Sequence, residues 1–343
     1  TWRQTDGYMI ARNFYEVDSN ILYPRVDVFG NSSGIVGCEF PILNYLVYLL
    51  SVVFGYHSWF GRLINLIVSS TGVYFLYLLV RDYFGKQAAL NTGVIVLSSI
   101  WFTYNRTNVP DTFGASLCII SLYFGIKYLK NQRNVDLTVF LLAGMIGCLS
   151  RISTAVILTL IVIPFFYSET TTRARVMTSL VALLIFSATC LWYFAWVPHL
   201  AETYNNQGHF FMGYTFAEGI KSLTADIPIV LKRFYDTSMK YIAFVVFFVS
   251  LVFAFKSRNW LVVAIFFIPF FTYSIITLKI AIGLVIDAYY AILYMLPMAF
   301  VAGWGLAQIP KKSIMIILLL AIGIEGVANQ IHVFEIRQPY KSM

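Results

Sequence analysis

Long apolar runs separated by short polar links dominate the chain. They cover residues 63–80, 88–104, 113–126, 137–149, 152–167, 176–197, 241–255, 260–278, 289–306 and 313–328. A helix needs about 20 residues to cross a hydrocarbon core of about 30 Å, so the shorter runs require polar flanks or a locally thinner bilayer. The pattern predicts an all-α integral membrane protein, a multi-spanning helical bundle with about ten crossings.

The apolar run at residues 43–54 allows two interpretations. As a helix its twelve residues reach about 18 Å, and Pro41 and Gly55 bound it. If the run crosses the membrane, residues 1–40 lie in the cytoplasm. If it lies in the membrane interface as a juxtamembrane helix, residues 1–40 share the external face with residues 105–110. Its length favours the interfacial position.

The composition supports a membrane protein. The chain is 59% hydrophobic and 12% charged, with a mean hydropathy of +0.75, whereas an average soluble protein is about 25% charged. A large soluble core does not explain this deficit, because a soluble surface would still need charges to cover it.

Charge placement predicts the orientation. The net charge is +8, and eleven of the 24 Lys and Arg lie in five short alternate links. They are Arg81, Lys86, Lys127, Lys130, Arg133, Arg173, Arg175, Lys256, Arg258, Lys311 and Lys312. The positive-inside rule makes these links cytoplasmic. Because the basic residues are strung out between apolar runs, they do not indicate nucleic-acid binding.

No internal repeat or soluble domain is evident. We expect one membrane domain over residues 1–343, with an external loop and the juxtamembrane helix at 1–58 and the bundle at 59–343. The chain begins at Thr1 with a moderately apolar segment, and we expect an N-terminal membrane helix to precede it.

Two carboxylates stand out near predicted external helix ends. Asp6 lies in the N-terminal segment, and Asp111 follows Pro110 at the start of a membrane helix. Each has an ordinary explanation, a solvated loop acid for Asp6 and a helix-start acid for Asp111. Together on one face, they suit a site in which one carboxylate takes a proton from an acceptor hydroxyl and the other assists.

Basic and aromatic residues at the same edge are further candidates. Arg151 interrupts an apolar stretch, and an isolated intramembrane Arg is a functional-site hypothesis by default, although it can also snorkel to the interface. Its planar donors suit a phosphate. Arg62 and Lys279 occupy similar positions at the external edge, but the argument that they belong to a functional site is weaker. Tyr289 and Tyr290 follow Asp287 at another external helix start, as interface aromatics often do.

No cofactor motif is present. The cysteines are scattered without metal-ligand spacing, which favours buried small hydrophobes, and no sequence feature indicates a metal, although a divalent metal is compatible with the chemistry. The four are Cys38, Cys118, Cys148 and Cys190.

Several short motifs, in this order and spacing, resemble the GT-C class of polyprenyl-phosphate-dependent membrane glycosyltransferases, near the lipid A aminoarabinose transferases and protein O-mannosyltransferases. The motifs are Thr1-Trp2-Arg3-Gln4-Thr5-Asp6-Gly7-Tyr8 with Ala11-Arg12-Asn13, Glu39-Phe40-Pro41-Ile42, Gly61-Arg62-Leu63, Val109-Pro110-Asp111-Thr112, Leu149-Ser150-Arg151, Asp287-Ala288-Tyr289-Tyr290, Leu296-Pro297 and Gly303-Trp304-Gly305-Leu306.

The resemblance implies roles for these residues. Asp6 matches the first external acid, which acts as base or orients the acceptor, and Asp111 matches the second. Arg151 and Tyr290 match positions that hold the carrier phosphate. We expect support from the nearby polar residues Arg3, Glu39, Arg62 and Asp287. The resemblance also implies an interfacial helix after the first loop and a missing N-terminal helix.

Two departures concern the donor sugar. Many relatives have an acid directly after the first Asp, where this chain has Gly7, and the aminoarabinose type has a Lys where this chain has Phe40. These differences argue against the aminoarabinose activity.

The sequence therefore predicts an inverting glycosyltransferase. Its donor is a polyprenyl-phosphate sugar, its acceptor a lipid, glycan or protein, and its surroundings membrane lipids. We expect a multi-pass protein of a bacterial plasma membrane with its site facing the periplasm or exterior. The alternatives are a transporter or lipid flippase, which would place binding residues near the midplane on broken, repeated helices, and a structural subunit, which would not depend on Asp6.

Overall fold

The computed structural model of the protein describes residues 2–27, 33–166, 170–204 and 213–334. Thr1, Tyr167 and part of the polar segment 198–240 lie outside these ranges. The described residues are 83% helical, and they contain no strand beyond an isolated bridge between Arg25 and Ile35. The expected all-α fold class is confirmed.

The helical elements follow one another closely along the chain. They are α1 (Trp2–Glu16), α2 (Ile42–Phe54), α3 (Phe60–Phe84), α4 (Lys86–Leu97), α5 (Ile100–Tyr104), α6 (Pro110–Asn131), α7 (Asn134–Ser150), η1 (Ile152–Thr154), α8 (Ala155–Leu158), η2 (Thr159–Ile161), α9 (Val162–Phe165), α10 (Thr172–Leu191), η3 (Trp192–Trp196), α11 (Val197–Tyr204), α12 (Phe216–Ala225), α13 (Ile227–Lys232), η4 (Arg233–Ser238), α14 (Tyr241–Lys256), α15 (Trp260–Ile280), α16 (Ile282–Ile286), η5 (Ala288–Ala291), α17 (Ile292–Ala307) and α18 (Lys312–Phe334).

Each of the ten apolar runs is helical where the structure describes it, but not all are long enough to cross a bilayer alone. Six helical stretches in the described ranges are long and apolar enough to cross a membrane. The number is seven if Ile227–Ser238 and Tyr241–Lys256, which are bent by 99° relative to each other, form one broken span. The runs at α4, at α7 and at Ile152–Phe165 are shorter. The 12 residues of α4 reach about 18 Å, so the count of about ten crossings remains a prediction.

Helix α17 forms the centre of the bundle. In the most apolar 18-residue window of the span Ala288–Ala307, 94% of residues are buried, against 72% in that of α6 and 17–28% in those of the other four spans. Small residues let its neighbours approach closely. A Cβ on Gly303 would lie 2.3 Å from Thr92 Oγ1 on α4, and one on Gly305 would lie 1.9 Å from Ser250 Oγ on α14.

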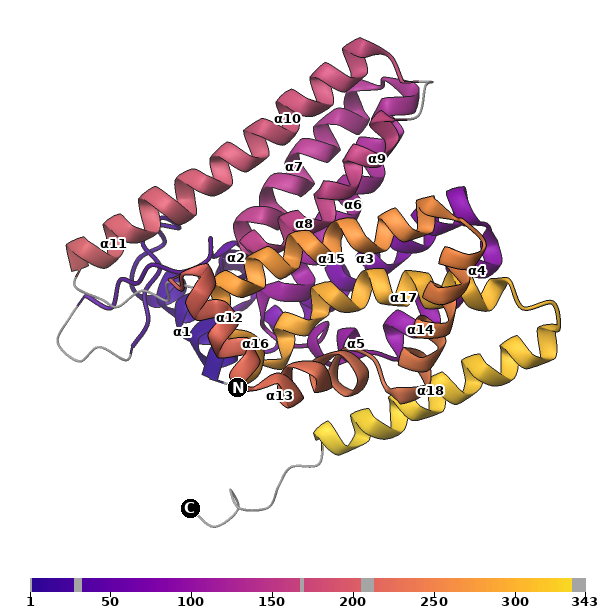
Figure 1. Ribbon diagram of the computed structural model, residues 1–343. Helices are drawn as coiled ribbons and strands as arrows, with labels where there is room; N and C mark the ends of the chain where they lie inside the picture. The colour runs from indigo at the N-terminus through magenta and orange to yellow at the C-terminus, as the bar shows by residue number, and fades with distance from the viewer. Residues whose placement is uncertain (1, 28–32, 167–169, 205–212, 335–343) are drawn as a thin grey trace.

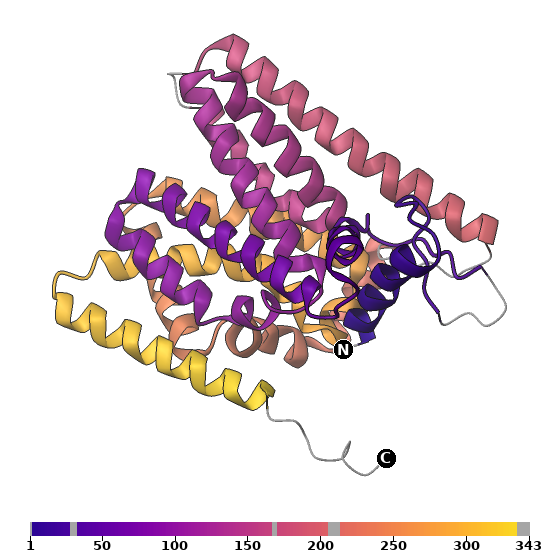
Figure 2. The same cartoon turned by 180° about the vertical axis from the view of Figure 1, so that it is seen from behind.

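The helices form two groups around this centre. Helices α6, α7, α9 and α10 (magenta to rose) extend to one side, whereas α14, α15, α17 and α18 (orange to yellow) form the other, and both views agree (Figures 1 and 2). Helix α2 packs between α1 and α3 through Leu43, Val47 and Ser51, while Leu49, Val52, Val53 and Phe54 are exposed. This two-sided apolar helix fits the interfacial interpretation, which no direct observation of a membrane tests.

The ends of the bundle differ in charge. The α3–α4, α14–α15 and α17–α18 links, all predicted as basic, lie at the right of Figure 1 and the left of Figure 2, away from α1 and α12. The opposite end carries α1, the start of α6 and the end of α7, where Arg3 and Arg151 both lie against Asp111. The alternation of the basic links is therefore consistent with the fold.

Candidate functional site

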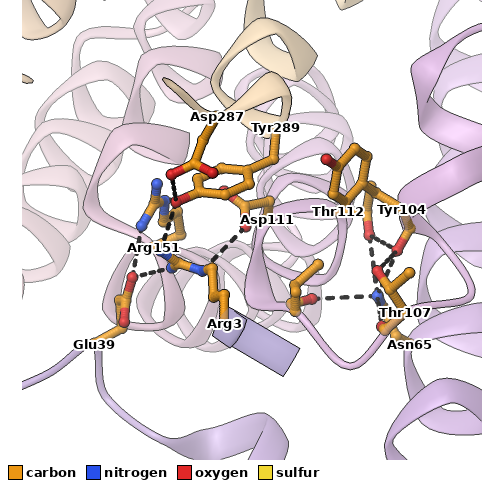
Figure 3. Close-up of polar contacts among 11 residues, drawn as sticks. Arg3, Glu39, Asn65, Tyr104, Thr107, Asp111, Thr112, Arg151, Asp287 and Tyr289 are labelled. Atoms are coloured by element: carbon orange, nitrogen blue, oxygen red, sulfur yellow. Dashed lines mark hydrogen bonds and ion pairs between the residues drawn. The ribbon is translucent and has the colours of Figure 1, made fainter. Parts of the chain in front are cut away.

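A buried cluster of four charges joins segments that are far apart in the sequence (Figure 3). Arg151 contacts two carboxylates: its Nη1 is 2.5 Å from Glu39 Oε1, and its Nε is 3.1 Å from Asp111 Oδ1. Arg3 pairs through Nη2 with the same Glu39 oxygen, and its Nε is 3.9 Å from Asp111 Oδ2. Two cations and two anions thus form one closed network.

Local structure explains why Asp111 and Arg151 of this network face each other. Val109 is extended and Pro110 occupies the first turn of α6, which suits a helix start. Asp111 follows in that turn, where the helix dipole favours an anion. Arg151 lies at a helix C-terminus: it is the C-cap of α7, its backbone is extended, and its N–H donates to Gly147 O. Because α6 and α7 pack antiparallel, the two residues meet.

Tyrosines close the cluster from the α17 side. Tyr289 Oη accepts a hydrogen bond from Arg3 Nη1 at 3.2 Å and donates to Asp287 Oδ2 at 2.9 Å. The guanidinium of Arg151 lies 5.0 Å from the ring centroid of Tyr290 and 5.5 Å from that of Tyr289. These are cation–π distances, so both tyrosines contact the basic residues.

Burial makes the charge pairing strong. The side chains of Arg151 and Asp111 are 5% and 7% exposed, and those of Arg3 and Glu39 are 13% and 15% exposed. Burial by itself raises the pKa of Glu39, but the positive charges of Arg3 and Arg151 outweigh it and bring that pKa to about 2. The Glu39 carboxylate is therefore ionised throughout the ordinary pH range.

One oxygen of the cluster retains hydrogen-bonding capacity. Asp111 Oδ2 is buried and accepts no hydrogen bond among the described residues. Buried carboxylate oxygens normally accept at least one. A hydroxyl group approaching this oxygen would find an acceptor that lies 3.9 Å from Arg3 Nε.

Asn65 of α3 fixes the link that precedes Asp111. Its buried Nδ2 lies 3.0, 2.8 and 3.2 Å from the carbonyl oxygens of Tyr104, Thr107 and Val109, and 3.1 Å from Thr112 Oγ1 (Figure 3). The link therefore relies on one amide for several of its backbone hydrogen bonds. It positions the start of α6 and, with it, the carboxylate of Asp111.

The remaining predicted residues lie nearby with different surroundings. Asp6 is half-buried on α1, three residues after Arg3 and hence on the same side of the helix. Arg62 is exposed on α3 and donates from Nε to Tyr8 Oη at 2.9 Å. Lys279 lies over the ring of Phe216, with Nζ 5.2 Å from its centroid. No described contact joins Arg62 or Lys279 to the cluster.

Packing explains both departures from the family pattern. A Cβ at Gly7 would lie 3.0 Å from Asn108 Nδ2 and 3.3 Å from Asn44 Nδ2, so an acidic side chain there would need its neighbours to move. Phe40 packs edge-on against Trp192 with 4.8 Å between ring centroids. Its N–H donates to Leu149 O. Position 40 therefore belongs to an apolar contact rather than to the charged cluster.

An apolar cavity lies between helices α3, α6, α15 and α17 of the bundle. Its empty volume is about 650 Å³, including the open space at its mouth, and its lining is almost entirely apolar. Ile119 of α6, Val156 of α8 and Leu293 of α17 contribute to it. Each lies three to eight residues along the chain from Asp111, Arg151 or Tyr290, and α6 both carries Asp111 and lines the cavity.

The cysteines and possible metal ligands add no further site. None of the four cysteines forms a disulfide. Cys118 and Cys148 approach to 3.8 Å between their sulfur atoms inside the α6–α7 contact. Across the described ranges, no group of three His, Cys, Asp or Glu residues is arranged to hold a metal ion.

The sequence interpretation undervalued two residues. Tyr289 looked like an ordinary interface aromatic, yet it contacts Arg3 and Asp287 directly. Asn65 was not singled out at all. Its signal was that of a lone amide in an otherwise apolar helical run, which indicates a buried hydrogen-bonding role.

Comparisons with known proteins agree on the architecture. The family described as dolichyl-phosphate-mannose-protein mannosyltransferase matches residues 39–196, which contain Glu39, Asp111 and Arg151. No curated protein matches the chain in sequence. Two kinds of solved structure resemble it: ArnT from Cupriavidus metallidurans and the archaeal oligosaccharyltransferase AglB from Archaeoglobus fulgidus.

The structural likeness extends over most of this chain but only part of the other proteins. Apo ArnT has a TM-score of 0.53 at 14% identity, covering 91% of this chain and 56% of ArnT. ArnT bound to undecaprenyl phosphate has the same TM-score at 13% identity, with 92% and 57% covered. AglB, in complex with an inhibitory peptide and a dolichol-phosphate, has a TM-score of 0.52 at 13% identity, with 95% and 50% covered. The chain thus spans little more than half the length of these proteins.

The family match includes three of the four cluster charges, and the shared fold spans nearly the whole chain. Both agree with the motif order in the sequence. The fold of this multi-pass membrane protein is therefore similar to that of ArnT and AglB, and its residues 39–196 resemble the family described as dolichyl-phosphate-mannose-protein mannosyltransferase.

Proposed function

We propose that the protein transfers a sugar, with inversion, from a polyprenyl-phosphate donor to a lipid, glycan or protein acceptor. The observation that carries this proposal is the buried Arg3–Arg151 pair, together with an apolar cavity lined in part by α6, the helix that begins beside this pair with Asp111. Guanidinium groups suit a phosphate, and an apolar cavity suits an isoprenoid chain. A molecule that combines both parts fits the two regions together.

The related structures support this chemistry. One ArnT structure contains undecaprenyl phosphate, and AglB contains a dolichol-phosphate and a peptide. Both lipids join an isoprenoid chain to a phosphate, as the proposed donor does. The inhibitory peptide in the AglB complex supports including a protein among the possible acceptors.

The proposed reaction assigns a role to each charge. Asp6 takes the proton of the acceptor hydroxyl, whose oxygen attacks the anomeric carbon of the sugar. The bond between that carbon and the phosphate oxygen breaks, and the lipid phosphate leaves with the electron pair. Arg151 and Arg3 stabilise the developing negative charge, and Tyr290 supports Arg151.

Asp111 suits an assisting role better than that of the base. Its Oδ1 lies 3.1 Å from Arg151 Nε and its Oδ2 lies 3.9 Å from Arg3 Nε, so the carboxylate is held beside both guanidinium groups. Its unbonded Oδ2 can still accept a hydrogen bond from a sugar or acceptor hydroxyl. Orientation of that hydroxyl is the contribution we assign to it.

The reaction is placed at the membrane face that carries α1 and the start of α6. The alternation of basic links makes this face external, and in a bacterium it would face the periplasm. The described part of the polar segment 198–240, which includes α12 and α13, lies at the same end and would help to shape the acceptor site (Figure 1).

Sugar transfer in membranes tests the proposal. The complete gene is expressed, and a panel of radiolabelled polyprenyl-phosphate sugars is offered to wild type and to Asp6→Asn. We expect transfer by wild type and a loss of at least about a hundredfold in Asp6→Asn at unchanged protein level, because general-base catalysis contributes about 10²–10⁴-fold.

Asp18→Asn is the matched control, because Asp18 pairs with Arg25 in the same N-terminal region but outside the cluster. Equal transfer by wild type and Asp6→Asn would refute the role of Asp6. Movement of an unaltered donor across the membrane without transfer would instead favour a transporter.

A further inference from the structure

One oxygen atom joins the two arginines of the cluster. Glu39 Oε1 accepts from Arg3 Nη2 and from Arg151 Nη1. The other two sides of Arg3 face Tyr289 Oη and Asp111 Oδ2, and Arg151 Nε faces Asp111 Oδ1. Anionic oxygens of the protein therefore already occupy the space between the guanidiniums (Figure 3).

A phosphate held between the same two guanidiniums would use the same donors. Phosphate and carboxylate oxygens prefer the same charge-assisted geometry with arginine. A second anion placed beside Glu39 and Asp111 would also meet like-charge repulsion at low exposure to water. Binding of the phosphate therefore requires one of the present partners to withdraw.

Glu39 is the partner best able to withdraw. Asp111 stands on a short side chain in the first turn of α6, and Tyr289 lies in η5 with its hydroxyl also bonded to Asp287. Glu39 lies in the irregular segment before α2 and has three side-chain torsions. Its carboxylate is also the most exposed of the four charged groups, at 15%.

The backbone around Glu39 is held in place, so the movement is confined to its side chain. The N–H of Phe40 donates to Leu149 O at 3.1 Å. The indole Nε1 of Trp192 donates to Cys38 O at 3.0 Å. Rotation of the Glu39 side chain can therefore release both guanidiniums without unfolding the segment.

We propose that the Glu39 carboxylate occupies the phosphate position between Arg3 and Arg151, and that a lipid phosphate binds by displacing it. This inference rests on the proposed function, because the lipid phosphate is the donor or product of the transfer. Glu39 keeps the two guanidiniums close together and compensates their charge. It also lowers the affinity of the site, because a ligand binds only the fraction of molecules in which the carboxylate has moved away.

Binding measurements on the full-length protein in detergent or nanodiscs test this competition. The probes are undecaprenyl phosphate, its neutral alcohol undecaprenol, and inorganic phosphate alone. We expect Glu39→Gln to bind undecaprenyl phosphate at least about tenfold more tightly than wild type, because the competing charge is gone. The affinity for undecaprenol should not change, since it has no phosphate to compete.

Two further variants serve as controls. Glu39→Asp keeps the charge on a side chain one methylene shorter, which cannot reach both guanidiniums equally, so we expect a smaller gain than with Gln. Asp18→Asn removes a carboxylate from another arginine pair and should leave the affinity unchanged. If Glu39→Gln does not fold, as size-exclusion and thermal melting would show, Glu39→Asp decides the question.

The outcomes separate this inference from the proposed function. Unchanged or weaker binding of undecaprenyl phosphate by the Glu39 variants would overturn the inference while leaving the transfer proposal intact. No binding by any of the proteins would overturn both. A gain for inorganic phosphate as well as the lipid would support the competition and show that the headgroup alone carries it.

Discussion

At the scale of single residues, the site is a balanced set of charges. Arg3 and Arg151 face Glu39 and Asp111, so the four side chains carry no net charge together. Removing one member leaves an uncompensated buried charge, which typically costs about 3–5 kcal/mol. The cluster therefore stabilises the contact between α1, α6 and α7 as well as offering a phosphate site.

The pKa of Glu39 predicts a dependence of stability on pH. Its folded value of about 2 lies below its ordinary 4.5, so its stabilising contribution is complete above pH 4.5 and is lost as pH falls toward 2. The full difference corresponds to about 3 kcal/mol. Thermal or denaturant unfolding in detergent between pH 7 and pH 2.5 measures it.

The Glu39→Gln variant supplies the comparison for this prediction. It has no carboxylate to protonate, so its stability should fall less than that of wild type over the same pH range. An equal loss in both proteins would mean that Glu39 is not held as an anion by the two arginines.

Single residues were only partly predictable from the sequence. Asp111 and Arg151 stood out because charges are rare in apolar runs, and the structure brings them to 3.1 Å. Their pairing with Glu39 and Tyr289 was not predictable, because it depends on how four distant segments meet. Hydropathy marks where a charge is costly, but it does not tell which opposite charge compensates it.

At the scale of elements, the cluster depends on how the start of α6 is held. The link before it runs from Tyr104 to Val109, and Asn65 donates to three of its carbonyls. Other elements are held similarly by single side chains. Arg233 of η4, for example, donates to Leu284 O at 3.0 Å and to Val285 O at 2.6 Å at the end of α16, just before Asp287.

Replacing Asn65 with Leu should destabilise the protein and reduce transfer. The substitution keeps a similar volume but removes the amide donor from the carbonyls of Thr107 and Val109, at about 1–3 kcal/mol each, whereas Tyr104 O still accepts from Thr107 Oγ1. We expect a loss of about 3 kcal/mol or more in the free energy of unfolding. Differential scanning fluorimetry and the transfer assay measure the two effects.

Thr71→Val is the control on the same helix, because Thr71 is exposed and its hydroxyl bonds only to Ile67 O. It should be close to wild type in both assays. An Asn65→Leu variant as stable as Thr71→Val would show that the link does not depend on this amide.

Helices were the most predictable elements, since every apolar run is helical where described. Their interruptions were less predictable. The 152–167 run divides into short α and 3₁₀ pieces up to Phe165, and residues 2–16, expected within an external loop, form α1. Polar residues dominate the first half of α1, and its buried apolar residues Ile10, Ala11 and Phe14 are confined to the second half, which is too short a pattern to predict the helix.

At the scale of the whole molecule, the bundle separates a basic end from the end that carries the site. This arrangement follows from the alternation of links, which the sequence predicted and which the positions of α1 and the basic links match (Figures 1 and 2). The apolar cavity was not predictable, because side chains from helices distant in the sequence line it.

Cysteine labelling in intact cells tests this orientation and the interfacial position of α2. Asn20 and Gln132 are both exposed, in the N-terminal region and in the α6–α7 link. A membrane-impermeant maleimide should label Asn20→Cys from outside, and should label Gln132→Cys only after permeabilisation. The native cysteines give little background, since three are buried, and Cys190→Ala removes the fourth.

Labelling of both positions from the same side would contradict the orientation. It would mean that α2 crosses the membrane or that the α4–α5 region does not. Either result would move residues 1–40 and the start of α6 to opposite faces or change the number of crossings between them.

The most direct test of the account is a cryo-electron microscopy structure of the full-length protein with a bound polyprenyl phosphate. The account predicts the phosphate within hydrogen-bonding distance of both Arg3 and Arg151, with the Glu39 carboxylate rotated away and the isoprenoid chain entering the apolar cavity. A phosphate bound elsewhere, with the four-charge cluster unchanged, would contradict it.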